Sequence, residues 1–116
     1  MKLGDICWVD FPAGAGRAQA GRRPAIVFQT AALPIALPTA LMVPLTTQHA
    51  ALRFPGTALV EADSRNKLTK ASVALVFQML AVDKRFIGPP TGALSQPVLH
   101  SIQLALDQLT GRKPQA

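Results

Sequence analysis

The sequence is poor in the residues that form cross-links, metal clusters and aromatic surfaces. Among 116 residues it has one cysteine, Cys7, one tryptophan and no tyrosine. A single cysteine excludes an intramolecular disulfide and a metal site built from several cysteines, so we expect Cys7 to be an inert, buried thiol. No run reaches the roughly 18 consecutive apolar residues of a membrane span, and the N-terminus carries no apolar signal segment. We therefore expect a cytoplasmic protein with no membrane partner; we also expect no cofactor.

Acidic residues are also scarce. Six Asp and Glu stand against twelve Lys and Arg, which gives a net charge of +6. Such an excess favours polyanionic partners through counterion release, and nucleic acid is the leading class. A basic composition also serves solubility, so the charge leaves both interpretations open. The length predicts one domain over residues 1–116, and the hydrophobic content of 49% predicts a homodimer that covers part of the apolar surface.

Short apolar runs between proline, glycine and polar residues predict strands rather than helices. They fall at residues 5–11, 24–30, 40–45, 57–61 and 72–82. Residues 31–41 contain Pro34 and Pro38, which predict an irregular connection. The segment 88–92, Gly-Pro-Pro-Thr-Gly, has the composition of a loop. We expect Trp8 and Phe28 to lie in the core.

The C-terminal segment changes period. Apolar residues from Val98 to Leu109 recur at helical spacing. Ser95 can cap this helix, Pro97 suits its first turn and Gly111 can end it. Several strands and one amphipathic helix predict a mainly β fold, a small antiparallel barrel or curled sheet closed by the C-terminal helix.

Two adjacent arginines, Arg22 and Arg23, stand between a loop of small residues and the apolar run that starts at Pro24. Guanidinium groups at a loop-to-strand junction can hold a phosphate through paired hydrogen bonds. We therefore expect the active site at this junction.

The chain resembles the MazF/PemK toxins of type II toxin-antitoxin systems in the order of several motifs. The matching stretches are Gly-Asp-Ile-Cys-Trp-Val-Asp-Phe at 4–11, Gln-Ala-Gly-Arg-Arg-Pro at 19–24, Val-Pro-Leu-Thr-Thr at 43–47, and the region from Ser72 through Gln78 to Lys84. The resemblance implies an SH3-like barrel that forms a homodimer, and a metal-independent endoribonuclease that cuts single-stranded RNA. It also implies an acidic, MazE-like antitoxin whose tail lies across the RNA groove.

The same resemblance implies roles for individual residues. By motif position, Arg23 and Thr46 match the catalytic arginine and threonine of the family. Gln19, Thr47, Ser72 and Gln78 fall at positions near the RNA groove of the family. Apart from the resemblance, we expect RNA contacts also from Arg17, Arg22, Gln48 and His49. In metal-free cleavage the 2′-hydroxyl attacks the adjacent phosphorus, and the site must stabilise the added charge and help move two protons. A guanidinium and a neutral hydroxyl suit the first task.

The chain departs from the family at two positions. Ala18 and Phe77 stand where many relatives have acidic residues. Without those carboxylates, either another group acts as the base or proton transfer receives less assistance. Such assistance typically raises the rate by about 100- to 10,000-fold. His49 is one substitute, since its ordinary pKa suits acid-base work near neutrality, and a solvated loop histidine is the alternative.

Other interpretations stay open at this point. Arg23 can instead form a structural salt bridge with Asp5 or Asp10, and Gln78 can be a satisfied core amide. A CcdB-like toxin that binds gyrase uses the same fold without cleaving RNA. A degenerate toxin that binds RNA without turnover is a third possibility.

Overall fold

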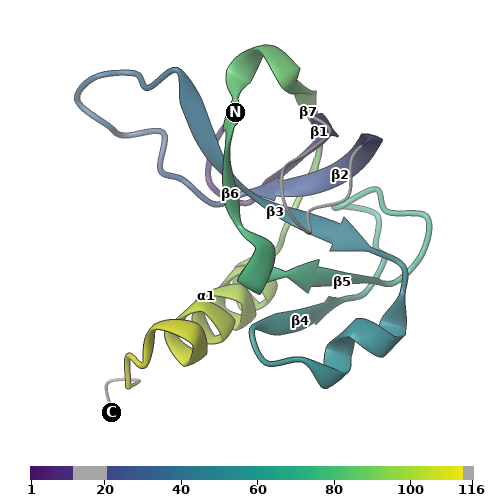
Figure 1. Cartoon of the computed structure of the whole chain (residues 1–116). Coiled ribbons are helices and arrows are strands. Elements are labelled where there is room, and N and C mark those ends of the chain that lie inside the picture. The colour runs from purple at the N-terminus through teal and green to yellow at the C-terminus, as the bar shows by residue number, and fades with distance from the viewer. Residues whose placement is uncertain (12–20, 114–116) are drawn as a thin grey trace.

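The computed structural model describes residues 1–11 and 21–113, which form one antiparallel sheet with a helix packed at one end (Figure 1). The strands are β1 (Asp5–Phe11), β2 (Gly21–Val27), β3 (Thr39–Thr46), β4 (Thr57–Val60), β5 (Ser72–Leu75), β6 (Leu80–Asp83) and β7 (Ile87–Ala93). The 3-10 turns η1 (His49–Arg53), η2 (Val76–Gln78) and η3 (Lys84–Phe86) lie between them, and the helix is α1 (Gln96–Thr110).

The sheet is strongly curved but not closed. Its order is β4-β5-β3-β2-β1-β7, and β6 pairs with the first half of β3. The predicted mainly β fold with a C-terminal helix is confirmed. A fully closed barrel is not formed, because β4 and β7 end the strand order without pairing with each other in the described residues.

β2 begins earlier than the sequence predicts. The strand starts at Gly21 rather than Pro24, because its first residues pair with the end of β1, with Arg22 opposite Asp10 and Arg23 opposite Val9. The two arginines are therefore strand residues. Because side chains alternate along a strand, Arg22 and Arg23 project to opposite faces of the sheet.

The strand predicted over 72–82 is split in two by η2. Continuing the register of β6 along β3 would place Phe77 opposite Leu45, yet Leu45 pairs with Ala74, so the turn takes up three residues. Pro44 lies opposite this break and has no N–H to donate to a ladder. The missing N–H of Pro44 thus interrupts the pairing with β3, and Gln78 lies in the turn η2 instead of in a strand.

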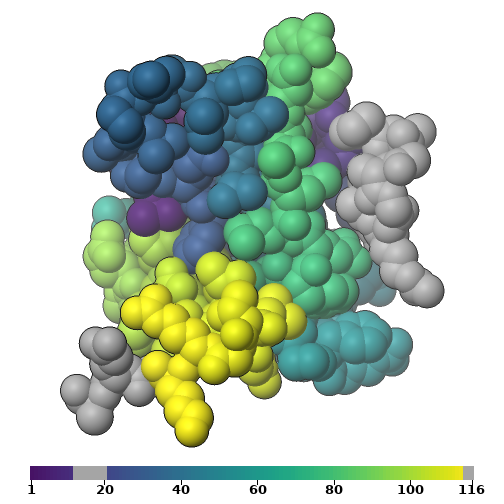
Figure 2. All heavy atoms as spheres, turned by 60° about the vertical axis from the view of Figure 1, so that its left-hand side comes forward, coloured from purple at the N-terminus to yellow at the C-terminus, as the bar shows by residue number. Residues whose placement is uncertain are grey.

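The proline-rich segment at 88–92 is a strand rather than a loop. It belongs to β7, which pairs with β1 at the edge of the sheet with two register shifts. Pro89 and Pro90 are exposed, and an edge strand tolerates residues that cannot donate to a ladder. The irregular connection between β2 and β3 agrees with the prediction, and it stands out as a lobe above the helix (Figure 2).

The helix α1 covers one end of the sheet. Ser95 precedes it, Pro97 lies in its first turn and Gly111 ends it in the left-handed conformation, as predicted. Ile102 and Ala105 pack with Ile6 in the larger of two core clusters. Phe28 packs against this cluster, as predicted. The prediction for Trp8 is wrong. Trp8 lies on the same face of β1 as Ile6, but 40% of it is exposed.

Candidate active site

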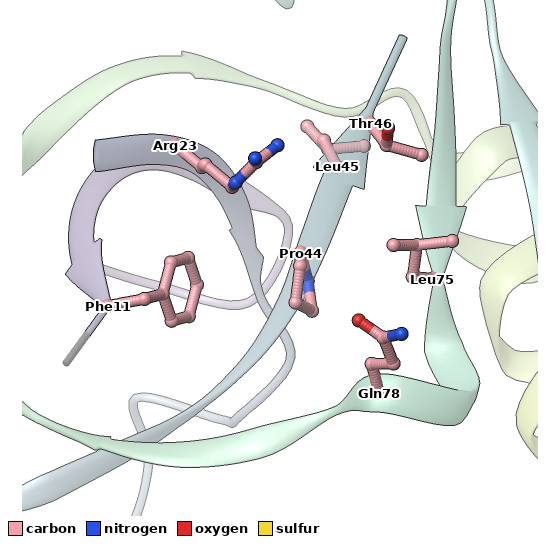
Figure 3. A pocket seen from close by; sticks show the side chains of 7 residues that line it. All are labelled: Phe11, Arg23, Pro44, Leu45, Thr46, Leu75 and Gln78. Atoms are coloured by element: carbon pink, nitrogen blue, oxygen red, sulfur yellow. The ribbon is translucent and has the colours of Figure 1, made fainter. Parts of the chain in front are cut away.

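Three polar side chains from separate segments meet at one small pocket (Figure 3). Arg23 from β2, Thr46 from the end of β3 and Gln78 from η2 line it. Four apolar residues complete the walls, namely Phe11, Pro44, Leu45 and Leu75. The pocket is small and opens to solvent, and the space that water can enter is about 10 Å³. The three polar residues are far apart in the sequence, and the register of β2, β3 and β5 brings them together.

Arg23 is the charged group of the pocket. Its guanidinium extends along the sheet toward the end of β3 (Figure 3). Its Nε is buried and has no hydrogen-bond partner among the described residues. Within the same residues it forms no ion pair with Asp5 or Asp10; Asp5 instead accepts a hydrogen bond from the backbone N of Lys2 at 2.8 Å. A buried donor without a partner is costly in a native protein, and an anion in the pocket would satisfy it.

Thr46 supplies a hydroxyl at the opposite wall. It is 8% exposed and lies in the last position of β3, opposite Val73. Its Oγ1 accepts a hydrogen bond from the backbone N of Gln48 at 3.2 Å. A hydroxyl has one proton to donate in addition to its acceptor sites. The turn after β3 therefore fixes Thr46 while leaving its own proton available to a ligand.

Gln78 brings an amide to the same pocket. The side chain reaches from η2 toward Pro44 (Figure 3), and it is half-buried. No side-chain hydrogen bond of Gln78 occurs among the described residues. The alternative of a satisfied core amide therefore does not match this geometry. An amide with a free donor pair and a free acceptor can read the edge of a base.

Other predicted contact residues lie on the opposite face of the sheet. Thr47 and Ser72 line a second, larger pocket that contains neither Arg23 nor Thr46. Arg22 stands over the ring of Trp8, with its guanidinium carbon 5.2 Å from the ring centroid. The predicted residues thus fall into two groups, separated by the alternation of side chains along β2, β3 and β5.

Gln48 and His49 do not line the small pocket. Both are exposed at the start of η1, and His49 Nε2 lies 2.9 Å from the carbonyl oxygen of Ala71. A carbonyl can only accept, so this ring nitrogen carries the proton. Phe77 is exposed and contacts Phe54, with ring centroids 5.7 Å apart. Arg17 and Gln19, like Ala18, lie outside the described residues.

The described residues that line the small pocket include no carboxylate, histidine or thiol. In the described part of the chain, no group of three or more His, Cys, Asp and Glu is placed to hold a metal ion. The Arg85 guanidinium pairs with Asp83 at 3.1 Å and lowers the pKa of that carboxyl, but this pair is exposed and away from the pocket. Burial raises the pKa of the Cys7 thiol. The chemistry available at the pocket is therefore charge stabilisation and hydrogen bonding.

The apolar walls were not predicted from the sequence. Pro44 and Leu45 belong to the same motif as Thr46, yet their pattern indicated only a buried strand. Leu75 and Phe11 gave no signal beyond strand alternation. The register that brings them to Arg23 appears only once β1, β2, β3 and β5 are paired.

Comparisons with known proteins agree on one group. A family model described as PemK-like, MazF-like toxin of type II toxin-antitoxin system matches residues 2–110. A crystal structure of MazF (form I) from Deinococcus radiodurans is 26% identical, covers 96% of each chain and has a TM-score of 0.78. Two MazE-MazF crystal structures from the same organism have TM-scores of 0.73 at 24% and 22% identity, covering 97% of this chain and 97% and 98% of theirs. No curated protein matches the sequence. No helix in the described residues is long and apolar enough to span a membrane.

Proposed function

The chain belongs to the PemK-like, MazF-like family of type II toxins, and from this premise we propose that it is a sequence-specific, metal-independent endoribonuclease acting on single-stranded RNA. One observation carries the proposal: the buried Nε of Arg23 lacks a hydrogen-bond partner among the described residues, and Arg23 lines a pocket together with Thr46 and Gln78. The pocket has the donors that a phosphate requires. Cleavage of mRNA in the cytoplasm would inhibit translation and growth.

The reaction follows from what these side chains can do. The 2′-oxygen of the nucleotide before the cleaved bond attacks the adjacent phosphorus, and the bond to the 5′-oxygen breaks. The products are a 2′,3′-cyclic phosphate and a 5′-hydroxyl. Negative charge accumulates on the phosphoryl oxygens, where Arg23 donates two hydrogen bonds and the Thr46 hydroxyl donates another. Gln78 contacts a base or the ribose and holds the nucleotide in line.

Proton transfer relies on water in this proposal. The proton of the 2′-hydroxyl leaves to solvent, and the 5′-oxygen takes one from solvent, because the described residues that line the pocket offer no carboxylate or imidazole. General acid-base assistance typically contributes about 100- to 10,000-fold. We therefore expect turnover to be slower than in relatives that keep the two acidic positions.

We also propose a homodimer and an acidic, MazE-like antitoxin as partners. The family and the MazE-MazF assemblies among similar structures support the antitoxin. Exposed apolar side chains support a second copy: Phe54 and Phe77 contact each other at the surface, and exposed Leu109 approaches Gly56 nearby. The basic net charge complements an acidic antitoxin tail.

The proposal is tested with purified protein and a long single-stranded RNA of varied sequence in EDTA. We expect cleavage at a small set of sites, with 2′,3′-cyclic phosphate ends, while DNA of the same sequence is bound but not cut. Intact RNA at all protein concentrations would contradict the proposal. In that case, inhibition of gyrase supercoiling would indicate a CcdB-like toxin, and tight RNA binding without products would indicate a degenerate one.

A further inference from the structure

A second pocket, which Thr47 and Ser72 line, lies on the face of the sheet opposite Arg23. The space that water can enter is about 190 Å³, and Trp8 from β1, Pro24 from β2 and Thr91 from β7 form part of the wall. Lys67 and Lys70 stand at its other side and are exposed. This space is smaller than the roughly 300–1,000 Å³ of enclosed small-molecule pockets, so a ligand bound here would stay partly exposed to solvent. Its combination of an aromatic ring, hydroxyls and two ammonium groups suits a nucleotide.

Trp8 offers ring surface to this pocket. It is 40% exposed although it lies in the middle of β1, and it lines the pocket. Arg22 stands over the ring but is not among the lining residues. The guanidinium contact therefore restrains the ring without occupying the pocket. A tryptophan held in this way is a stacking platform for a base, a contact available to every nucleobase.

The loop that carries the two lysines is fixed by buried hydrogen bonds. Asn66 is 2% exposed; its side chain accepts from the backbone N of Asp63 and of Leu68, both at 3.0 Å. It also donates to the carbonyl oxygen of Glu61 at 2.8 Å. Behind it, a side chain at Gly92 would clash with the Asn66 backbone.

This network holds Lys67 in a conformation that a lysine rarely adopts. Its φ is 60°, in the left-handed region. Such a conformation costs on the order of 1–3 kcal/mol and persists only where the surroundings enforce it. The backbone at Lys67 is therefore ordered before a ligand binds, which favours binding, and Lys67 and Lys70 line the same pocket as Trp8.

The two pockets lie back to back at one end of the sheet. Arg22 and Arg23 are neighbours in β2 and face opposite sides, and Thr46 and Thr47 do the same at the end of β3. A single strand that crosses this edge can occupy both pockets at once. Resting on the proposed nuclease function, we propose that Trp8, Lys67 and Lys70 form a nucleotide-binding subsite that stacks a base flanking the cleaved bond and contacts its phosphates.

The fluorescence of Trp8 tests this directly. The chain has one tryptophan and no tyrosine, so its emission reports on this pocket. The probe is a mixed-sequence 2′-O-methyl oligonucleotide of roughly 10 nucleotides, in which the 2′-oxygen cannot attack. We expect it to quench Trp8, and an oligonucleotide with abasic positions and the same phosphates to quench far less. Cleavage of the unmodified RNA is measured separately.

Variants separate stacking from charge. Trp8→Leu should weaken binding of the labelled 2′-O-methyl oligonucleotide by about 5- to 100-fold, with a smaller loss for Trp8→Phe. Phe86→Leu is the matched control, because Phe86 is also 40% exposed and has Arg85 over its ring at 5.4 Å, but lines neither pocket. Lys67→Gln and Lys70→Gln should each lower the slope of log binding constant against log salt concentration by about 0.7. The control Phe86→Leu should leave this slope unchanged.

The outcomes distinguish the subsite from the nuclease activity. Base-dependent quenching supports the subsite whether or not the unmodified RNA is cut. Cleavage without quenching, or equal quenching by the abasic probe, would overturn the subsite and leave the nuclease intact. Quenching by an acidic peptide of equal charge, but not by the oligonucleotide, would overturn it in favour of a protein partner at this surface.

Discussion

Replacing Arg23 by methionine distinguishes a catalytic arginine from a structural one. In the free protein its Nε is a buried donor without a partner in the described residues, and leaving such a donor unsatisfied costs about 1–3 kcal/mol. Methionine keeps an unbranched stem against Phe11 and Leu45 and removes that donor. We therefore expect Arg23→Met to fold with unchanged or greater stability, up to about 1 kcal/mol more, although it loses activity.

The expected sizes follow from the two roles of the side chain. A gain of about 1 kcal/mol raises the melting temperature by about 3–6 °C for a domain of this length. The loss of a preorganised donor at the phosphoryl oxygens lowers kcat by about 100- to 1,000-fold or more. Arg23→Lys keeps the charge but not the paired donors, so its activity should fall between that of the unmodified protein and that of Arg23→Met.

The assays are thermal unfolding and single-turnover cleavage of one RNA. Arg22→Met is the matched control, since Arg22 is the preceding residue of β2 and faces the other side of the sheet. It should weaken RNA binding and leave single-turnover cleavage at saturating protein nearly unchanged. A clear drop in melting temperature for Arg23→Met, together with retained cleavage, would refute the reasoning and assign Arg23 a structural role.

Three further predictions concern single side chains. Thr46→Val removes the hydroxyl in an isosteric change and should slow cleavage by about 10- to 100-fold, whereas Thr46→Ser should restore most of it; equal rates for both variants would count against a donor role. His49→Ala should change the rate by less than about twofold, because the ring is held at Ala71 away from the pocket; a large loss that follows an imidazole pKa in the pH profile would assign it the base. The Cys7 thiol is buried and its pKa is raised, so its thiolate fraction at pH 8 is lower than that of a free cysteine. Ellman's reagent should therefore react with Cys7 only after unfolding, and rapid labelling of the native protein would contradict its placement.

The fold was largely predictable because its signals are local. The apolar periodicity from Val98 to Leu109 and the flanking Ser95 and Gly111 defined the helix, and short β-branched runs defined most strands. The family resemblance, drawn from motif order, is confirmed by the match over residues 2–110. Non-local pairing caused the errors. The start of β2 depends on β1, the break at η2 depends on Pro44 in β3, and β7 is a strand despite Pro89 and Pro90 because it pairs at an edge.

The candidate site was predictable as a set of residue types but not as a geometry. The sequence gives no reason of its own to assign Arg22 and Arg23 different roles. The difference comes from their positions in β2, which direct the two side chains to opposite faces of the sheet. Gln78 was expected to contact RNA from its motif position, and the turn at η2 is what carries it to the small pocket. Trp8 was expected in the core as a large apolar residue, but 40% of it is exposed and it lines an open pocket.

The central claim is that the 2′-hydroxyl of the substrate is the nucleophile in a pocket formed by Arg23, Thr46 and Gln78. The most direct measurement places a single 2′-deoxynucleotide immediately before the mapped cleavage site of an otherwise unmodified RNA. We predict that binding persists and cleavage at that site is lost, while the unmodified RNA yields a 2′,3′-cyclic phosphate. Continued cleavage of the 2′-deoxy substrate at the same bond would contradict this mechanism.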